Sequence, residues 1–297
     1  MKIAIVEVGP RDGFQSVKKF IPTELKKEII DGLVQSGIKN IQVTSFVKAE
    51  AIPQLQDAAE IAKYSIEKYP DLVINALTAN GRGIEYAIKA GVSEINYAIS
   101  LSEIHNMLNT KRTHDQSFHE LETMVDANQN VNFVLDIGTA FGYYNEQISL
   151  EDVMGFIKRG YDIGIRAFDI CDSIGIADPG MVKKYITCIL KEYKDCQFDV
   201  HIHDTRNMGI INTYTAIECG ITRIQTTLGG LGGCPFAHGA TGNTCTEDMV
   251  FLLHRMGYET GINFDKLLEI SKYQFSRIKG NYSGHHVCIN LDNVKKQ

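Results

Sequence analysis

The stretch Phe198-Asp199-Val200-His201-Ile202-His203-Asp204 alternates like a β-strand and carries two imidazoles at its end. Successive side chains on a strand point to opposite faces, so His201 and His203 share a face, with Cα atoms roughly 6.6 Å apart. That spacing lets both imidazoles bind one divalent ion with bonds of about 2.0–2.1 Å. A lone His-x-His pair also occurs as ordinary satisfied histidines inside a polar barrel, so the rest of the chain has to decide between the two interpretations.

Around this stretch, short β-rich runs alternate with amphipathic helical runs almost from end to end. Helices are predicted, for example, over Thr23–Ser36, Pro53–Tyr69, Gly83–Ala90, Leu150–Tyr161, Met181–Tyr193 and Ile210–Cys219. Eight strands are predicted, at Ile3–Val8, Ile41–Phe46, Leu72–Leu77, Glu94–Ile99, Val131–Ile137, Ala167–Cys171, Phe198–His203 and Arg223–Thr227. Eight βα units indicate an α/β fold, a (β/α)8 TIM barrel, with a doubly wound open sheet as the alternative.

The chain length suits one such barrel, which uses about 250 residues. We therefore expect a single domain over residues 1–297, in which 263–297 form a short C-terminal helical extension. Within it, Asn263–Lys279 has the pattern of one more helix, and Gly280–Gln297 that of an irregular tail. Left-handed C-cap glycines are predicted where helices return to strands, at Gly37, Gly91, Gly164 and Gly220.

Composition narrows the classes of function. The chain has 44% hydrophobic residues, a net charge of −6 and no long basic block, which argues against a nucleic-acid partner. No segment approaches the roughly 20 apolar residues of a membrane helix, and the N-terminal apolar run is too short for a signal peptide. We expect a cytoplasmic protein without a membrane partner. The seven cysteines lack paired short spacings, so neither a disulfide framework nor a four-cysteine zinc site is predicted.

Polar clusters fall where the predicted strands end, which is where barrel enzymes carry their chemistry. The first strand leads into a glycine-flanked turn that contains Arg11 and Asp12. The eighth leads into Gly229–Asn243, a loop with six glycines that also contains Cys234 and ends at Asn243. Taken singly, Asp12 could merely cap a helix and the loop could be a solvated surface loop.

Together these motifs carry a family resemblance that covers nearly the whole chain. The segments, in order, are Glu7–Gly13, Thr44–Val47, Ser102-Glu103, His201–Thr205, and Gly230–Pro235 with Gly242-Asn243. They closely resemble the hydroxymethylglutaryl-CoA (HMG-CoA) lyase family, whose members are metal-dependent barrels.

The resemblance implies one divalent metal ion, commonly Mg²⁺ or Mn²⁺, held by Asp12, His201, His203 and Asn243. Zn²⁺ or Co²⁺ could compete for such mixed ligands. Arg11 would stabilise the enolate, Cys234 would transfer a proton, and His201 and Gln42 would complete the catalytic set. A homo-oligomer, taken as a dimer, is also expected.

The implied reaction cleaves a 3-hydroxyacyl-CoA, with HMG-CoA giving acetyl-CoA and acetoacetate as the leading case. This chemistry suits the residue types, because such a cleavage must remove a hydroxyl proton and stabilise an enolate. A metal ion and a fixed guanidinium do this. A thiol, an imidazole or water can then protonate the enolate.

Two departures from the family pattern keep alternatives open. Gln42 stands where such lyases usually have glutamate, and it cannot act as a base; Tyr143-Tyr144 stands where Cys-Pro is common. The chain could therefore be an aldolase or Claisen-type lyase or synthase acting on another hydroxy acid or acyl-CoA. It could also be a catalytically impaired homologue that only binds.

Other residues receive weaker assignments. Lys111-Arg112 could meet CoA phosphates or simply begin a solvated helix, and Asp172 could orient the substrate or a water on the metal. Asp204 is predicted to support a ligand histidine. For His285-His286 a surface role is favoured over a second metal site.

Overall fold

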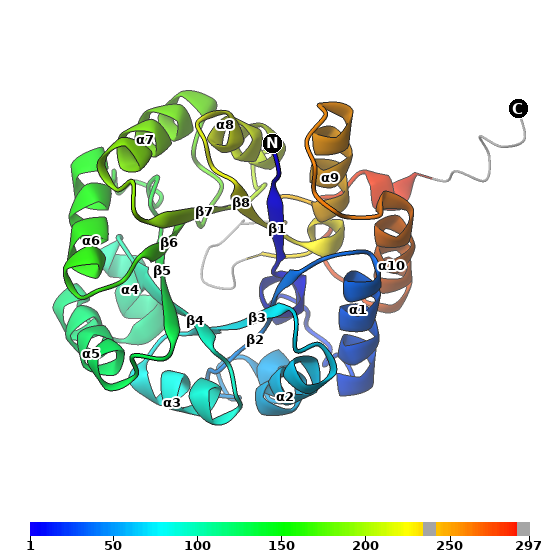
Figure 1. The fold of residues 1–297 in the computed structure, drawn as a ribbon, viewed down its shortest axis with the longest axis horizontal. Helices are drawn as coiled ribbons and strands as arrows, with labels where there is room; N and C mark the ends of the chain where they lie inside the picture. Colours follow the sequence, from blue (N-terminus) through cyan, green and yellow to red (C-terminus); the bar gives the residue numbers. More distant parts are fainter. Residues whose placement is uncertain (234–241, 290–297) are drawn as a thin grey trace, which may run out of the picture.

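Eight parallel strands close into a barrel, with helices around it (Figure 1). The structure, a computed structural model, describes residues 1–233 and 242–289. Strand β1 pairs with both β2 and β8, which closes the sheet. The strands are β1 Ala4–Glu7, β2 Asn40–Ser45, β3 Val73–Thr78, β4 Glu94–Ser100, β5 Asn132–Gly138, β6 Ala167–Asp172, β7 Gln197–Ile202 and β8 Arg223–Thr226. The (β/α)8 prediction is confirmed, and the open sheet is excluded.

The helices follow the predicted alternation, with signals at their ends as expected. Asp178 caps α7 by accepting a hydrogen bond from the amide of Met181 at 2.9 Å, and proline follows it. The four predicted C-cap glycines all have φ between 90° and 115°. The helices are α1 Thr23–Gln35, α2 Ala58–Lys68, α3 Gly81–Lys89, α4 Glu103–Thr110, α5 His114–Ala127, α6 Leu150–Asp162, α7 Pro179–Glu192, α8 Gly209–Glu218, α9 Thr246–Arg255 and α10 Phe264–Arg277.

The barrel interior is unusually polar. The parallel register aligns Asp136, Asp169, Asp199 and Arg223 on neighbouring strands. Arg223 bridges Asp199 at 2.9 Å and Glu94 at 2.7 Å. Burial is the main cause that raises the pKa of both Asp136 and Asp199 to about 7. This row of carboxyls lies in a place that branched aliphatic side chains usually fill in such barrels.

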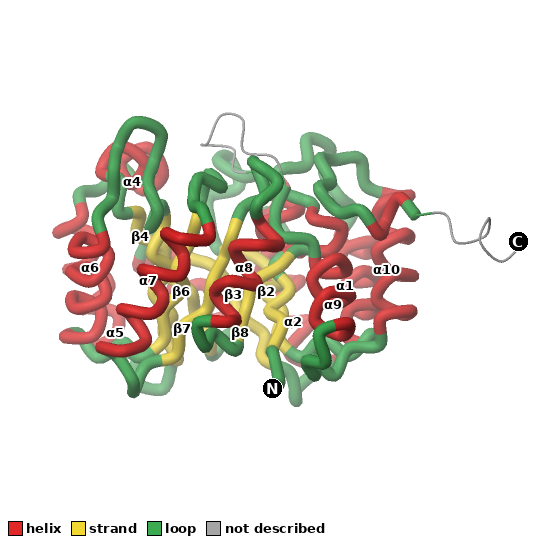
Figure 2. Tube along the Cα trace, turned by 90° about the horizontal axis from the view of Figure 1, so that it is seen from above, coloured by secondary structure: helices red, strands yellow, loops and turns green. Residues whose placement is uncertain are grey.

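The carboxyl ends of the strands meet at one end of the barrel. Figure 2 shows α4 above the end of β4, at the opposite end of the molecule from the N terminus. The βα turns at this end, including Gly9–Gly13 after β1, therefore surround a common space. In the described part of the chain, no helix is long and apolar enough to cross a membrane.

The C-terminal extension packs onto the barrel. Helix α10 lies beside α1 and α9 (Figure 1). The described part of the predicted irregular tail contains a short helical turn, His286–Cys288, and is hydrogen-bonded to the barrel, since the amide of Gly284 donates to the carbonyl of Gly229 at 2.9 Å. Treatment of 1–297 as one domain stays a prediction.

Candidate active site

Arg11 and Asp12 are held in a tight helical turn directly after β1. Their backbone amides both donate to the carbonyl of Val8, at 3.1 and 2.7 Å. The Asp12 carboxylate accepts hydrogen bonds from Nη1 of Arg11 at 2.5 Å and from Nε2 of Gln15 at 2.6 Å. Burial alone would raise the pKa of Asp12, but the charge of Arg11 and further partners outweigh it, and the pKa lies well below its usual range. Asp12 is therefore an anion at neutral pH.

His201 and His203 bring two neutral nitrogens next to this anion. Their Nε2 atoms are 3.2 Å apart, and Nε2 of His201 is 3.9 Å from Oδ2 of Asp12. Burial is the main cause that lowers the pKa of His201 to about 3, and it also lowers that of His203. Neutral imidazoles are the form that binds metal. Adjacent ligand atoms on an ion with bonds of about 2.1 Å lie roughly 3 Å apart, so the two nitrogens suit one ion.

Asn243 completes the cluster from the far end of the glycine-rich loop. Its backbone pairs with His203 in an antiparallel bridge, and its Nδ2 donates to Oδ2 of Asp12 at 2.6 Å. The buried Oδ1 has no hydrogen-bond partner in the described part of the chain. A rotation of this amide that exchanges its O and N would turn the oxygen toward Asp12. Gly232 makes room for this side chain, because a Cβ there would lie 2.2 Å from Nδ2.

A divalent metal ion fits these residues. Asp12, His201 and His203 are buried and place one ligand atom each within 4.8 Å of the others; they form the one such group found among the described residues. One carboxylate, two neutral imidazoles and an unpartnered amide oxygen form a donor set for a divalent cation. The structure thus brings the four predicted ligands together, while the part of Asn243 as a ligand stays a prediction.

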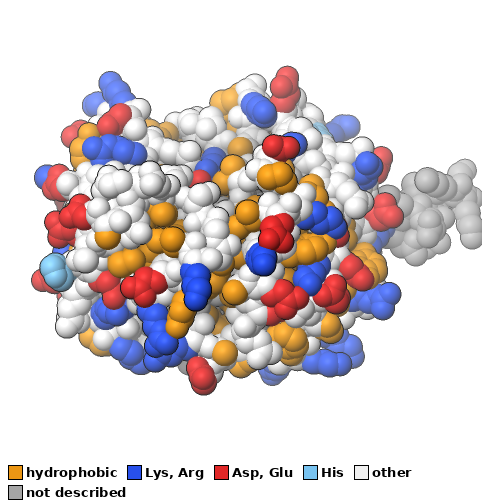
Figure 3. Space-filling view, turned by 60° about the horizontal axis from the view of Figure 1, so that its bottom comes forward, with side chains coloured by type: hydrophobic (Ala, Val, Ile, Leu, Met, Phe, Trp, Pro, Cys, Tyr) orange, Lys and Arg blue, Asp and Glu red, His pale blue; other side chains and the backbone are white. Residues whose placement is uncertain are grey.

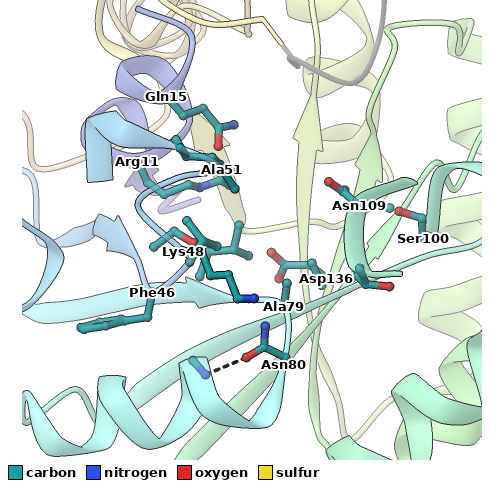
Figure 4. A pocket seen from close by; sticks show the side chains of 18 of the residues that line it. Arg11, Gln15, Phe46, Lys48, Ala51, Ala79, Asn80, Ser100, Asn109 and Asp136 are labelled. Carbon is teal, nitrogen blue, oxygen red and sulfur yellow. Dashed lines mark hydrogen bonds between the residues drawn. The ribbon is translucent and has the colours of Figure 1, made fainter. Parts of the chain in front are cut away.

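Besides His201, the predicted catalytic residues are Arg11, Gln42 and Cys234. Arg11, labelled in the pocket of Figure 4, lines the same cavity as Asp12, His201 and His203. Gln42, fully buried on β2, accepts a hydrogen bond from Nε of Arg11, so it positions the guanidinium. Cys234 lies outside the described residues. The chain on either side of it is joined where the amide of Gly242 donates to the carbonyl of Gly232 at 3.2 Å.

Arg11, Asp12, His201 and His203 border a cavity of about 1480 Å³. Cationic side chains also line it, namely Lys48, Arg82, Lys111 and Arg112. Arg112 forms an ion pair with Glu120 at 2.9 Å, so it is partly neutralised. The cavity therefore joins the candidate metal centre to a wall with positive charge.

Two lining residues, Asp136 and His105, are absent from the predicted site. Figure 4 shows Asp136 pointing into the pocket. The signal available in the sequence is an acidic residue with apolar neighbours on both sides in strand 132–138, where Leu135 and Ile137 are fully buried. His105 lies in the first turn of α4, where sequence gives no such signal.

Asp172 and Asp204, two residues with weaker predicted roles, accept hydrogen bonds from the protein backbone. Asp172 accepts from the amides of Ile176 and Ala177, at 2.9 and 3.0 Å, and so shapes the loop after β6. Asp204 accepts from the amide of Gly209 at 2.6 Å, at the start of α8; this carboxylate supports a helix and not, as predicted, a ligand histidine.

The His285-His286 pair does not form a second cluster of metal ligands in the part of the chain that the structure describes. Nδ1 of His286 lies 2.6 Å from Oδ1 of Asp248, and the backbone amides of both histidines donate to the same carboxylate. The pair therefore fastens the C-terminal segment to α9.

Comparison with known proteins agrees with this geometry. A family model described as HMGL-like matches residues 2–273. The hydroxymethylglutaryl-CoA lyase YngG of Bacillus subtilis is 36% identical over 275 residues, which cover 92% of each chain. The human mitochondrial hydroxymethylglutaryl-CoA lyase is 35% identical over 92% of this chain and 84% of its own length.

Among solved structures, an HMG-CoA lyase from Acinetobacter baumannii in complex with coenzyme A and 3-methylmalate superposes with a TM-score of 0.92. The two sequences are 33% identical, and the match covers 98% of this chain and 94% of the other. Fold, motif order and sequence identity over nearly the full length thus agree. The chain belongs to the HMGL-like family of carbon–carbon lyases related to HMG-CoA lyase.

Proposed function

We propose that this protein cleaves the C2–C3 bond of a 3-hydroxyacyl-CoA with the help of one divalent ion, and that HMG-CoA, giving acetyl-CoA and acetoacetate, is its substrate. The observation that carries the proposal is the buried cluster of Asp12, His201 and His203 beside the guanidinium of Arg11 in one cavity. The related A. baumannii lyase binds coenzyme A and a hydroxy acid, which supports an acyl-CoA substrate here.

Asp12, His201, His203 and Asn243 would hold the ion, with Mg²⁺ or Mn²⁺ as the proposed metals. When bound, the ion polarises substrate oxygens and lowers the pKa of the 3-hydroxyl. The planar guanidinium of Arg11 would donate hydrogen bonds to the thioester oxygen, where negative charge develops as the enolate forms. Gln42 and Asp12 hold that guanidinium on two sides, so no reorganisation is needed during the reaction.

The cationic wall of the cavity suits the phosphates of CoA. Lys48 and Arg82 line it together with Lys111, whose left-handed backbone (φ 60°) ends α4. Lysine and arginine are the usual partners of phosphate. On the face drawn in Figure 3, basic side chains are interspersed with acidic and hydrophobic ones.

A second candidate is cleavage or synthesis of a different hydroxy acid or acyl-CoA. Two observations favour it: Gln42 is an amide, and Asp136 places a carboxyl on the cavity wall. An acyl end with a hydroxyl or other donor would suit Asp136 better than the carboxylate of HMG-CoA, unless Asp136 is protonated.

The experiment is a panel of 3-hydroxyacyl-CoA substrates assayed for acetyl-CoA release with Mg²⁺, with Mn²⁺ and with EDTA. Metal-dependent release from HMG-CoA is the expected result. Turnover only of other members supports the second candidate, and binding of metal and CoA without any turnover supports a catalytically impaired homologue. A cytoplasmic location and a dimeric state stay predictions, which cell fractionation and light scattering can check.

A further inference from the structure

His105 is held rigidly in the first turn of α4. Its backbone amide donates to the capping hydroxyl of Ser102 at 3.1 Å. Nδ1 of the ring lies 2.6 Å from Oγ of Ser100, at the end of β4, and the ring of Tyr143 packs against it with centroids 5.0 Å apart. Cap, hydroxyl and aromatic ring together fix the orientation of the imidazole.

The other ring nitrogen of His105 is available. In the described part of the chain Nε2 has no hydrogen-bond partner, although the residue is only 3% exposed. His105 lines the same cavity as Arg11, Asp12, His201 and His203. In Figure 4, Ser100 lies across the pocket from Arg11.

Apart from the proposed metal ligands, the carboxyls on the cavity wall are those of Glu50 and Asp136, and burial raises the pKa of Asp136 to about 7. Gln42 is an amide, and Arg11 is a permanent cation. The thiol of Cys171 faces Asp169, and burial raises its pKa well above the usual value. Burial is the main cause that lowers the pKa of His105 to about 4, so its imidazole is neutral near pH 7. The positive end of α4 acts in the same direction.

We propose that His105 is the general base that removes the 3-hydroxyl proton of the substrate, with Ser100 as its positioning residue. The assignment rests on the proposed function. Nδ1–H donates to Oγ of Ser100, which leaves a lone pair on Nε2. Nε2 takes the hydroxyl proton while the C3–O bond becomes a carbonyl and the C2–C3 electron pair passes into the thioester as an enolate.

The protons balance over the cycle. A separate acid delivers one proton to C2 of the enolate, which gives acetyl-CoA, and His105 later releases the proton that it took from the hydroxyl. In this way a histidine on α4 supplies the base that Gln42 cannot be.

The test compares His105→Gln, His105→Ala and Ser100→Ala with the wild type in the acetyl-CoA release assay. We expect His105→Gln to lower kcat by about 10²–10⁴-fold, the usual effect of a lost general base, with KM and Mn²⁺ affinity unchanged. Exogenous imidazole should restore part of the rate of His105→Ala, an effect that a structural role would not produce. Ser100→Ala should cost less than His105→Gln.

His114→Gln is the matched control, because His114 contacts the backbone carbonyl of the same Ser100 at 2.9 Å but does not line the cavity. It should keep the wild-type rate. Full activity of His105→Gln, or a parallel loss of Mn²⁺ affinity, would overturn the role of His105. A wild type that releases acetyl-CoA from no member of the panel would refute the proposed function instead.

Discussion

The side-chain oxygen of Gln42 accepts a hydrogen bond from Nε of Arg11, so a residue of β2 fixes the orientation of a guanidinium that follows β1. Asp12 holds the same guanidinium at Nη1, at 2.5 Å. Both partners are buried, which keeps water from competing for these donors. The amide at position 42 thus keeps the geometry that a carboxylate would give, without its charge.

Replacement of Gln42 should show what that amide contributes. Gln42→Leu removes the acceptor and leaves a buried charged donor unpaired, which costs about 1.5–3 kcal/mol. We expect kcat to fall by roughly 10–100-fold, with Mn²⁺ affinity unchanged. Gln42→Glu keeps the acceptor and should cleave HMG-CoA at least as fast as the wild type. Steady-state kinetics on both variants checks this, and an unimpaired Gln42→Leu would contradict it.

Gly232 should be essential for the placement of Asn243. A Cβ at this position would lie 2.2 Å from Nδ2 of Asn243, so Gly232→Ala must displace that side chain. We expect Mn²⁺ affinity, measured by isothermal titration calorimetry, to fall by about tenfold or more. Gly155→Ala is the matched control, since a Cβ on this α6 residue meets nothing within 4 Å. Equal affinities of the two variants would show that Asn243 is no ligand.

His203→Ala should remove most metal binding and activity and leave the fold intact. The side chain lies at the carboxyl end of the barrel and not among the residues that stabilise its base. Calorimetry with Mn²⁺ and circular dichroism give the two readouts. The exposed His119→Ala should behave as the wild type. Retained Mn²⁺ affinity in His203→Ala would rule out the proposed ligand set.

Cys234→Ser should separate binding from proton transfer. If the thiol protonates the enolate, this variant keeps metal and substrate binding but loses roughly 10²–10⁴-fold in kcat. Rapid-quench measurement of acetyl-CoA formation checks this. A full wild-type rate would end the assignment of Cys234 as the proton donor.

The carboxyls inside the barrel should make stability fall as the pH rises. The folded-state pKa of Asp136 and Asp199 is about 7, against an ordinary value of 3.8. The folded state therefore binds protons more tightly than the unfolded state between about pH 4 and 7, so the free energy of unfolding decreases through this window.

Asp169 lies on β6, between the strands that carry Asp136 and Asp199. One of its carboxyl oxygens has no hydrogen-bond partner in the described structure, and burial raises its pKa as well. Asp169→Asn should therefore flatten the decline of the unfolding free energy between pH 5 and 8, measured by urea denaturation. The exposed Asp126→Asn should leave the profile as it is. A profile of Asp169→Asn with the wild-type slope would contradict the expectation.

The periodicity of the sequence was sufficient to predict the barrel, because each strand and each helix has its own local pattern of apolar residues. It was also sufficient for His201 and His203, which share a strand face, and for Asp12, which directly follows a strand. The break between α4 and α5 was harder to foresee, since it depends on Lys111, a non-glycine residue with φ 60°. No local propensity predicts that conformation for lysine.

His105 and Asp136 became visible only with the fold. His105 lies on a helix, and it reaches the cavity because α4 sits above the end of β4 (Figure 2). Asp136 faces inward because of its register with Asp169 on β6. Contacts between residues far apart in sequence place both side chains, so a pattern read along one segment cannot identify them.

The hydroxyl of Ser283 donates to the backbone carbonyl of Asn243 at 2.7 Å, and the carbonyl of Asn281 accepts from the amide of Gly232 at 3.3 Å. A segment that follows all eight strands in the chain thus supports the residue proposed as the fourth ligand. A nascent chain that has finished all eight strands would still lack these two hydrogen bonds, because residues 281–283 are not yet synthesised. Trimming by proteases after α10 would therefore remove this support for Asn243 while every strand of the barrel remains in the chain.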